Sequence, residues 1–232
     1  MSKNKIALSL VVAGILGASS ALAETSGAFV GLQVGYGGLE FKGENDSNYL
    51  NLPTKGSGSI SAGGSRYGFV AGYKQFFTPE FGARYYASFD LGTDFTGEYV
   101  NEVAGNTFKV NSTIITANAD ALYNFISSNN LDLGAFLGLS LGYSHHTVKA
   151  ETEKGIAFKY LDMNPSGFDL GINFGVRTNI AQNHGIELYS RFGVLQQEKE
   201  LKETYSNINF YKTATYKASQ PYQVGLRYSF SF

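Results

Sequence analysis

The sequence contains no cysteine and no tryptophan, and only 16% of its 232 residues are charged, against about 25% in an average protein. Without cysteine, disulfide scaffolds, thiolate metal sites and cysteine nucleophiles are excluded. The formal charge of −1 gives no support to a nucleic-acid partner, which usually requires a basic surface. The chain is instead rich in glycine, with 28 residues, and in phenylalanine and tyrosine, with 18 and 16. High glycine combined with low charge disfavours a helical bundle.

The first 23 residues have the pattern of a secretory signal peptide. Two lysines precede an almost wholly apolar run over residues 6–16, and the small-residue sequence Ala21-Leu22-Ala23 follows. We expect cleavage between Ala23 and Glu24, which leaves residues 24–232 as the exported domain. The apolar run is shorter than the roughly 20 residues that a membrane-spanning helix needs. No later segment has enough uninterrupted apolar residues, so we expect no helical membrane anchor.

Eight segments of the exported chain alternate apolar and polar side chains with a period of two, as strands with one apolar face do. Each spans about ten to fourteen residues, enough for a tilted strand to cross a bilayer, whereas soluble strands average about five or six. A soluble β-sandwich also alternates, but its strands would be shorter. The segments cover residues 28–41, 66–77, 81–91, 113–125, 131–143, 168–177, 186–194 and 222–232.

The connections between these segments alternate in length. Three are short, with 3 to 5 residues, and four are long, with 20 to 24 residues: 78–80, 126–130 and 181–184, against 42–64, 92–111, 144–166 and 196–219. This asymmetry is typical of outer-membrane barrels, and in hydrocarbon an open sheet edge would leave unpaired amides. The sequence therefore predicts an all-β fold: a closed, eight-stranded, antiparallel transmembrane β-barrel with four long extracellular loops and three short periplasmic turns. Without tryptophan, its interfacial belts must consist of tyrosine and phenylalanine.

Several of these segments also resemble a known family. The strings that carry the resemblance are GAFVG at 27–31, AGYKQFFTP at 71–79, FGARYY at 81–86, DALYNF at 120–125, GFDLGIN at 167–173, RTNI at 177–180 and YQVGLRY at 222–228. They are similar to the Hop-like outer-membrane proteins of Helicobacter, Campylobacter and related bacteria. The resemblance implies a β-barrel in the outer membrane of a Gram-negative bacterium. Family members include adhesins and porins, but this chain lacks a large extracellular domain, and the family provides no catalytic residues to transfer.

The resemblance also concerns the carboxyl terminus. Tyr228, Phe230 and Phe232 alternate with smaller or polar residues and look like the signal that outer-membrane barrels present to their insertion machinery. A simpler interpretation, compatible with this one, is that Phe232 is the last lipid-facing side chain. Outer-membrane lipid, including lipopolysaccharide, and the insertion machinery are therefore the expected partners.

Charged residues recur on the polar faces of the predicted strands, in their periplasmic half. An eight-stranded barrel has a lumen just wide enough to be filled by side chains, and isolated charges there would be strongly penalised. We therefore expect ion pairs between adjacent strands, with Arg84 opposite Asp120 and Arg177 opposite Glu187. The whole predicted network comprises Lys74, Arg84, Asp120, Asp132, Arg177, Glu187, Arg191 and Arg227. A structural polar plug is the favoured interpretation, and a narrow, slightly cationic pore for small solutes is the alternative.

An enzyme is the competing class of function, because some small outer-membrane barrels modify lipids. His145 and His146 follow the fifth segment, with Ser140, Ser144 and Glu151 nearby, but no motif connects them into a catalytic site. His184 lies in a short turn, and too few further ligands are present to predict a metal or cofactor site. We therefore expect no catalytic, cofactor-binding or metal-binding residues.

The predicted loops contain polar and mixed-charge sequences at 45–48, 151–154 and 198–203, the last of which could form a helical turn. Exposed loops often carry function, so a host or cell-surface ligand is a further expected partner. The sequence thus favours an outer-membrane barrel with a filled lumen and a structural or surface-interaction role.

Overall fold

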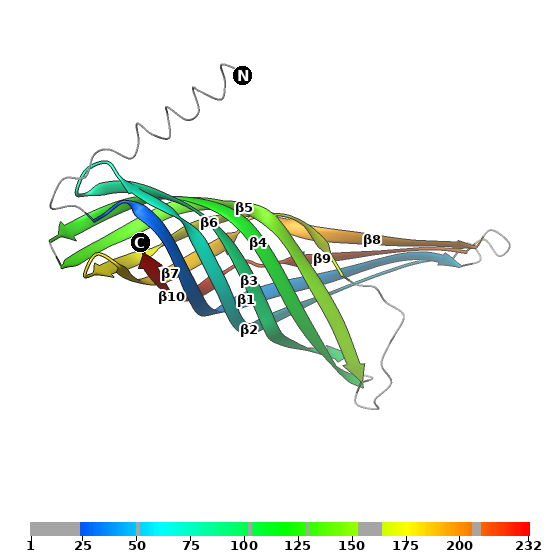
Figure 1. Cartoon of the computed structure of the whole chain (residues 1–232). Coiled ribbons are helices and arrows are strands. Elements are labelled where there is room, and N and C mark those ends of the chain that lie inside the picture. The colour runs from blue at the N-terminus through cyan, green and yellow to red at the C-terminus, as the bar shows by residue number, and fades with distance from the viewer. Residues whose placement is uncertain (1–23, 50–51, 102–103, 129, 153–163, 206–209) are drawn as a thin grey trace, which may run out of the picture.

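The computed structural model describes residues 24–49, 52–101, 104–128, 130–152, 164–205 and 210–232. Its strands form a strongly tilted cylinder from which long hairpins project at one end (Figure 1). The strands are β1 (Gly27–Tyr49), β2 (Leu52–Phe76), β3 (Phe81–Asn101), β4 (Ala104–Ser127), β5 (Leu131–Thr152), β6 (Ser166–Ile180), β7 (His184–Gly193), β8 (Gln196–Tyr205), β9 (Phe210–Ser219) and β10 (Gln223–Ser231). The described residues include no helix that is both long and apolar enough to cross a membrane.

Eight of these strands close into a ring. Strands β1 to β7 pair in sequence order, β7 pairs with β10, and β10 pairs with β1 from Phe29↔Ser231 to Gly37↔Gln223. All of these pairings are antiparallel. Strands β8 and β9 form a hairpin outside the ring, and β9 pairs with the distal half of β1. The predicted closed, eight-stranded antiparallel architecture is therefore confirmed.

The two ends of the ring differ as predicted, but the long connections are largely strand rather than loop. Strand β1 continues to Tyr49 and β5 to Thr152, well past the predicted ends of these segments. Residues 198–203 belong to β8, so the predicted helical turn is wrong. In the β8–β9 hairpin, Glu198 lies opposite Lys217, and such opposite-charge pairs stabilise a sheet. Part of the third connection, residues 153–163, lies outside the described residues.

The projecting strands divide into two groups. Strands β2 and β3 are paired only as far as Gly63↔Thr96, whereas β3, β4 and β5 remain paired with one another to Asn101↔Ala104 and Asn106↔Thr152. One group is a four-stranded extension in the order β2-β1-β9-β8, and the other is a three-stranded extension of β3, β4 and β5. The two extensions point in different directions in Figure 1.

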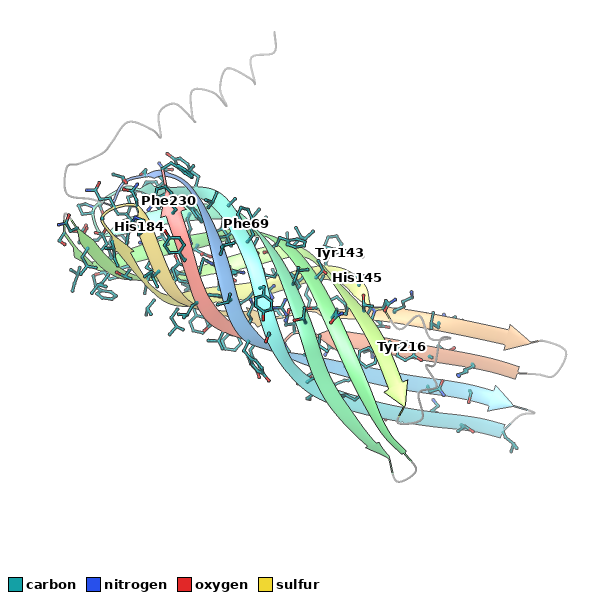
Figure 2. All side chains as sticks on the ribbon, turned by 60° about the horizontal axis from the view of Figure 1, so that its bottom comes forward. Phe69, Tyr143, His145, His184, Tyr216 and Phe230 are labelled. Atoms are coloured by element: carbon teal, nitrogen blue, oxygen red, sulfur yellow. The ribbon has the colours of Figure 1, made fainter. Side chains whose placement is uncertain are left out.

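The distribution of side chains is inverted relative to a soluble protein. Apolar side chains such as Leu32 (65% exposed) and Leu137 (61%) cover the outer wall, while Arg66, Asp120 and Asn124 are buried inside. Figure 2 shows Phe230 near the end with the short turns and Tyr143 toward the end with the extensions. Exposed aromatic residues lie at both ends of the apolar wall: Phe77, Phe81, Tyr123, Phe125 and Tyr228 at the first end, and Tyr36, Tyr67, Phe89, Tyr143 and Phe168 at the second. An apolar outer wall of this kind is suited to lipid.

Candidate functional site

The centre of the lumen contains a buried ion-pair network contributed by four strands. Glu187 of β7 accepts hydrogen bonds from Arg84 of β3 and from Arg227 of β10, the latter at 3.1 Å. Arg84 also donates through Nε to Asp120 Oδ2 at 2.8 Å. All four side chains are buried. The structure therefore brings Arg84 and Asp120 together as the sequence predicts, and it adds Glu187 and Arg227 to the same cluster.

Aromatic rings pack against these arginines. The Arg84 guanidinium carbon lies 4.4 Å from the centre of the Phe136 ring, and that of Arg227 lies 4.9 Å from the Tyr189 ring and 5.0 Å from the Tyr86 ring. A cation over an aromatic face is stabilised by the quadrupole of the ring. The inward-facing aromatic residues therefore fill the lumen between the charged groups and hold the arginines in place.

A second cluster surrounds Glu24, close to the short turns. The Glu24 carboxylate accepts hydrogen bonds from Lys74 Nζ at 2.7 Å and from Arg177 Nη2 at 2.5 Å, while Asn124 lies 3.4 Å away. Arg177 lies opposite Glu187 in the β6–β7 register, but its ion pair is with Glu24. In place of the predicted Arg177–Glu187 pair, Arg177 binds Glu24, and Glu187 binds Arg84 and Arg227. Glu24 precedes the first strand, so strand alternation gave no indication of its position.

A third group of charges lies nearer the extensions. Arg191 donates to Asp169 at 2.6 Å and to Ser140 at 2.9 Å, and Asp90 accepts from Gln33 at 2.5 Å. Arg66 donates to Ser112 at 3.3 Å. The remaining predicted member, Asp132, accepts from Ser127 at 2.6 Å and from Asn179 at 3.5 Å, near the turns.

The buried charges of the described lumen are balanced. The predicted set contained five cations and three anions, whereas the described lumen has six of each. The cations are Arg66, Lys74, Arg84, Arg177, Arg191 and Arg227, and the anions are Glu24, Asp90, Asp120, Asp132, Asp169 and Glu187. The expected slight excess of positive charge is therefore absent from this part of the chain. Arg66, Asp90 and Asp169 lie on polar faces of the predicted segments, so alternation alone could have identified them.

Little empty space remains between these side chains. Two cavities in the lumen each have a volume of about 10 Å³, which is about the space that one water molecule requires. One lies beside Asp90 and Arg227, and the other beside Lys74 and Arg177. Toward the extensions, Leu39 and Phe41 of β1 form an apolar cluster with Val110 of β4 and Ala218 of β9. This mouth cluster joins the two extensions across the inside of the molecule.

Comparison with known proteins identifies the family. The family model described as Helicobacter outer membrane protein matches residues 68–232. The chain belongs to this family. It is accordingly a β-barrel protein of the Gram-negative outer membrane, with its extensions on the extracellular side. No curated protein matches the chain.

Solved outer-membrane barrels resemble this family member in structure. The attachment invasion locus protein of Yersinia pestis has 13% identity and a TM-score of 0.36, with 89% of this chain and 100% of that chain covered. Neisserial surface protein A has 15% identity and a TM-score of 0.40, with 89% and 99% covered. OprG from Pseudomonas aeruginosa has 11% identity and a TM-score of 0.41, with 90% and 99% covered. Similarity at this level carries no information on ligands or activity.

The three histidines of this Helicobacter outer membrane family member do not face one another, because the adjacent His145 and His146 lie on opposite faces of β5 and His184 begins β7. His146, three residues beyond the membrane-facing Tyr143, is fully buried and its Nε2 donates to Gln197 Oε1 at 3.2 Å. Burial, together with the nearby Arg66 guanidinium, lowers the pKa of His146 to about 4. His145 faces outward beside Thr147, and His184 contacts Tyr228 at the periplasmic end.

The hydrogen-bond partner of His146 is a residue of the β8–β9 hairpin and not a nucleophile. Gln197, its partner, also donates to the Phe168 carbonyl at 2.9 Å, so one amide joins β8 to β5 and to β6. Ser140 bonds to Arg191, and the side chain of Glu151 lies outside the described residues. Within the described part of the chain, no group of three or more histidine, aspartate or glutamate side chains could hold a metal ion.

The carboxyl terminus completes the wall. Phe232 is 72% exposed, its ring contacts Phe230 edge-on at 5.3 Å, and its amide donates to the Ala28 carbonyl at 3.0 Å. The expected assembly signal of Tyr228, Phe230 and Phe232 thus lies on the lipid-facing side at the periplasmic end. The expected signal peptide, residues 1–23, lies outside the described residues, and Glu24 is the first described residue.

Proposed function

We propose that this protein is a closed, non-enzymatic barrel that anchors its two extracellular extensions for interaction with ligands at the cell surface. The observation that carries the proposal is the filled lumen. Six buried cations balance six buried anions, and two of its cavities hold about one water molecule each. A conducting pore requires a continuous aqueous path, which the ion pairs, their aromatic neighbours and the mouth cluster all oppose.

The extensions support the second half of the proposal. They are continuous with the membrane-spanning strands, as in β1, which runs through 23 residues from Gly27 to Tyr49. A surface built on such strands is held more rigidly than a loop, and rigid scaffolds position binding residues well. The proposed partners are a host or cell-surface ligand on the outside, the insertion machinery during assembly and the surrounding outer-membrane lipid.

Planar-bilayer recording tests the closed lumen. Purified protein inserted into a lipid bilayer should give no stable conductance steps, while a general porin added to the same bilayer shows that insertion is detected. Stable single-channel steps from the wild-type protein would overturn the proposal in favour of a narrow channel. The same preparation should release no fatty acid from outer-membrane lipid, and lipid hydrolysis would show that an enzyme is present.

The surface role is tested by shortening the β8–β9 hairpin. Replacing residues 198–217 with a short turn retains all eight strands of the ring. Cells that display this variant at normal surface levels should bind less to host cells or to neighbouring bacteria than cells with the wild-type protein. Unchanged binding would refute a role for the four-stranded extension.

A further inference from the structure

We propose that the four-stranded extension carries a lateral binding site for the oligosaccharide of lipopolysaccharide. The site is a cavity of about 530 Å³, which lies in the usual size range of ligand pockets, about 300–1,000 Å³. It is lined by two rows of side chains, and each row runs across β2, β1 and β9 through residues that are paired in the strand register. The rows are Ser57, Glu44 and Thr215, and Lys55, Asp46 and Thr213.

The strand register determines which way the cavity opens. Strand β1 pairs with β2 without a bulge along its whole length, so even-numbered β1 residues share one face throughout. Leu32 and Tyr36 on that face are exposed on the outer wall, whereas Leu39 and Phe41 on the opposite face are buried in the mouth cluster. Glu44 and Asp46 therefore lie on the outer wall. The cavity faces sideways, above the lipid that surrounds the barrel.

The distance from the membrane determines which part of a lipid reaches the cavity. Glu44 and Asp46 follow the rim residue Tyr36 by 8 and 10 residues. At about 3.3 Å per residue and a strand tilt of about 40°, they lie about 20–25 Å beyond Tyr36. The acyl chains and the phosphorylated glucosamine headgroup end below this height. The oligosaccharide of lipopolysaccharide, which projects outward from that headgroup, extends to it.

The chemistry of the cavity favours sugar hydroxyls over phosphate. Its lining provides two carboxylates, one ammonium and three hydroxyls, and that ammonium is paired with Asp46, so the lining leaves no unpaired cation for a phosphate. Lys55 lies 3.3 Å from Asp46, and Lys217 lies 3.3 Å from both oxygens of Glu44, which holds the carboxylates in position. A sugar hydroxyl both donates and accepts, so it can bind carboxylates, the ammonium and hydroxyls alike. The lining offers none of the aromatic anchors that dominate protein interfaces.

Binding of free oligosaccharide tests the proposal. The protein in detergent or nanodiscs is titrated with oligosaccharide released by mild acid from lipopolysaccharide of the producing bacterium, and binding is measured by calorimetry or NMR. The double variant T213V/T215V removes two hydroxyls with little change in shape. Losing the two hydrogen bonds should lower the affinity by about fivefold to a hundredfold. S57Y, which places a ring in the cavity, should abolish binding.

The matched control is T54V, because Thr54 is exposed on the other face of the same extension and should bind like wild type. Headgroup disaccharide lacking the oligosaccharide, and dextran as an unrelated glucan, should both bind at least tenfold more weakly. Equal binding by wild type and by both cavity variants would overturn the proposal, as would binding of the headgroup alone. The site lies outside the lumen, so neither result depends on whether the barrel conducts.

Discussion

Replacing Glu187 with glutamine gives the most direct test of the charge-filled lumen. Glu187 is 3% exposed and is bound by the guanidinium groups of both Arg84 and Arg227. The amide keeps the size of the side chain but removes its charge, which leaves six cations against five anions in the described lumen. Removing one partner of a buried ion pair costs about 3–5 kcal/mol. Because glutamine can still accept one hydrogen bond, we expect a loss of about 3 kcal/mol in the free energy of unfolding.

Urea unfolding in detergent micelles or lipid vesicles measures this loss. It should be followed by far-UV circular dichroism, because the chain has no tryptophan for fluorescence. The control is E200Q, since Glu200 forms an ion pair of 2.9 Å with Lys202 in which both side chains are exposed, at 45% and 66%. Exposed pairs contribute little, so E200Q should cost less than about 0.5 kcal/mol.

A second substitution in the lumen separates charge balance from packing. In E187Q/R227M the excess cation is removed, so the double variant should be more stable than E187Q although it carries one more substitution. If E187Q unfolds within about 1 kcal/mol of wild type, the lumen is hydrated well enough to screen its charges. That result would refute both the pairing argument and the filled lumen.

Three further predictions concern other parts of the chain. Ala181 lies in a periplasmic turn with a φ of 51°. A left-handed backbone costs an L-residue about 1–2 kcal/mol. The variant A181G should therefore raise the free energy of unfolding by about 1 kcal/mol in the same urea assay. His146 has a pKa of about 4 in the folded protein and about 6.5 in the unfolded chain. The free energy of unfolding of the wild type should therefore fall as the pH is lowered from about 6.5 toward 4, and that of H146Q should fall less. Parallel pH profiles of the two proteins would contradict this. Deleting Phe232 should reduce outer-membrane insertion and leave the chain in the periplasm, and normal surface labelling of the truncated chain would refute a role in assembly.

The membrane-spanning parts of the strands could be predicted because lipid imposes a strict rule on them. Every second residue, such as Leu137 and Leu139, must be apolar, while intervening residues face a polar lumen. Beyond the membrane rim both faces of a strand are exposed to water. The alternation of apolar and polar residues therefore disappears, and the sequence of residues 42–49 resembles that of a loop. The same reason explains β8, whose Glu and Lys residues occupy both faces of an exposed hairpin.

The lumen was only partly predictable. Arg84 and Asp120 belong to adjacent strands, lie on the same face and are at a similar height above the short turns at 78–80 and 126–130, so their contact follows from the sequence. The contact of Glu24 with Lys74 and Arg177 does not, because no periodic pattern places a residue that precedes the first strand. The bond between His146 and Gln197 depends on how a hairpin outside the ring folds back against β5 and β6.

The unbroken pairing of β1 with β2 has a mechanical consequence. The two strands form a ladder of 23 residue pairs that crosses the membrane and continues to the tip of the extension. A pulling force applied at that tip acts parallel to the strands and loads the hydrogen bonds to the neighbouring strands in shear. Many bonds must then break together, whereas bonds that are peeled apart break one at a time. A bacterium tethered by this hairpin would transmit the load directly into its envelope.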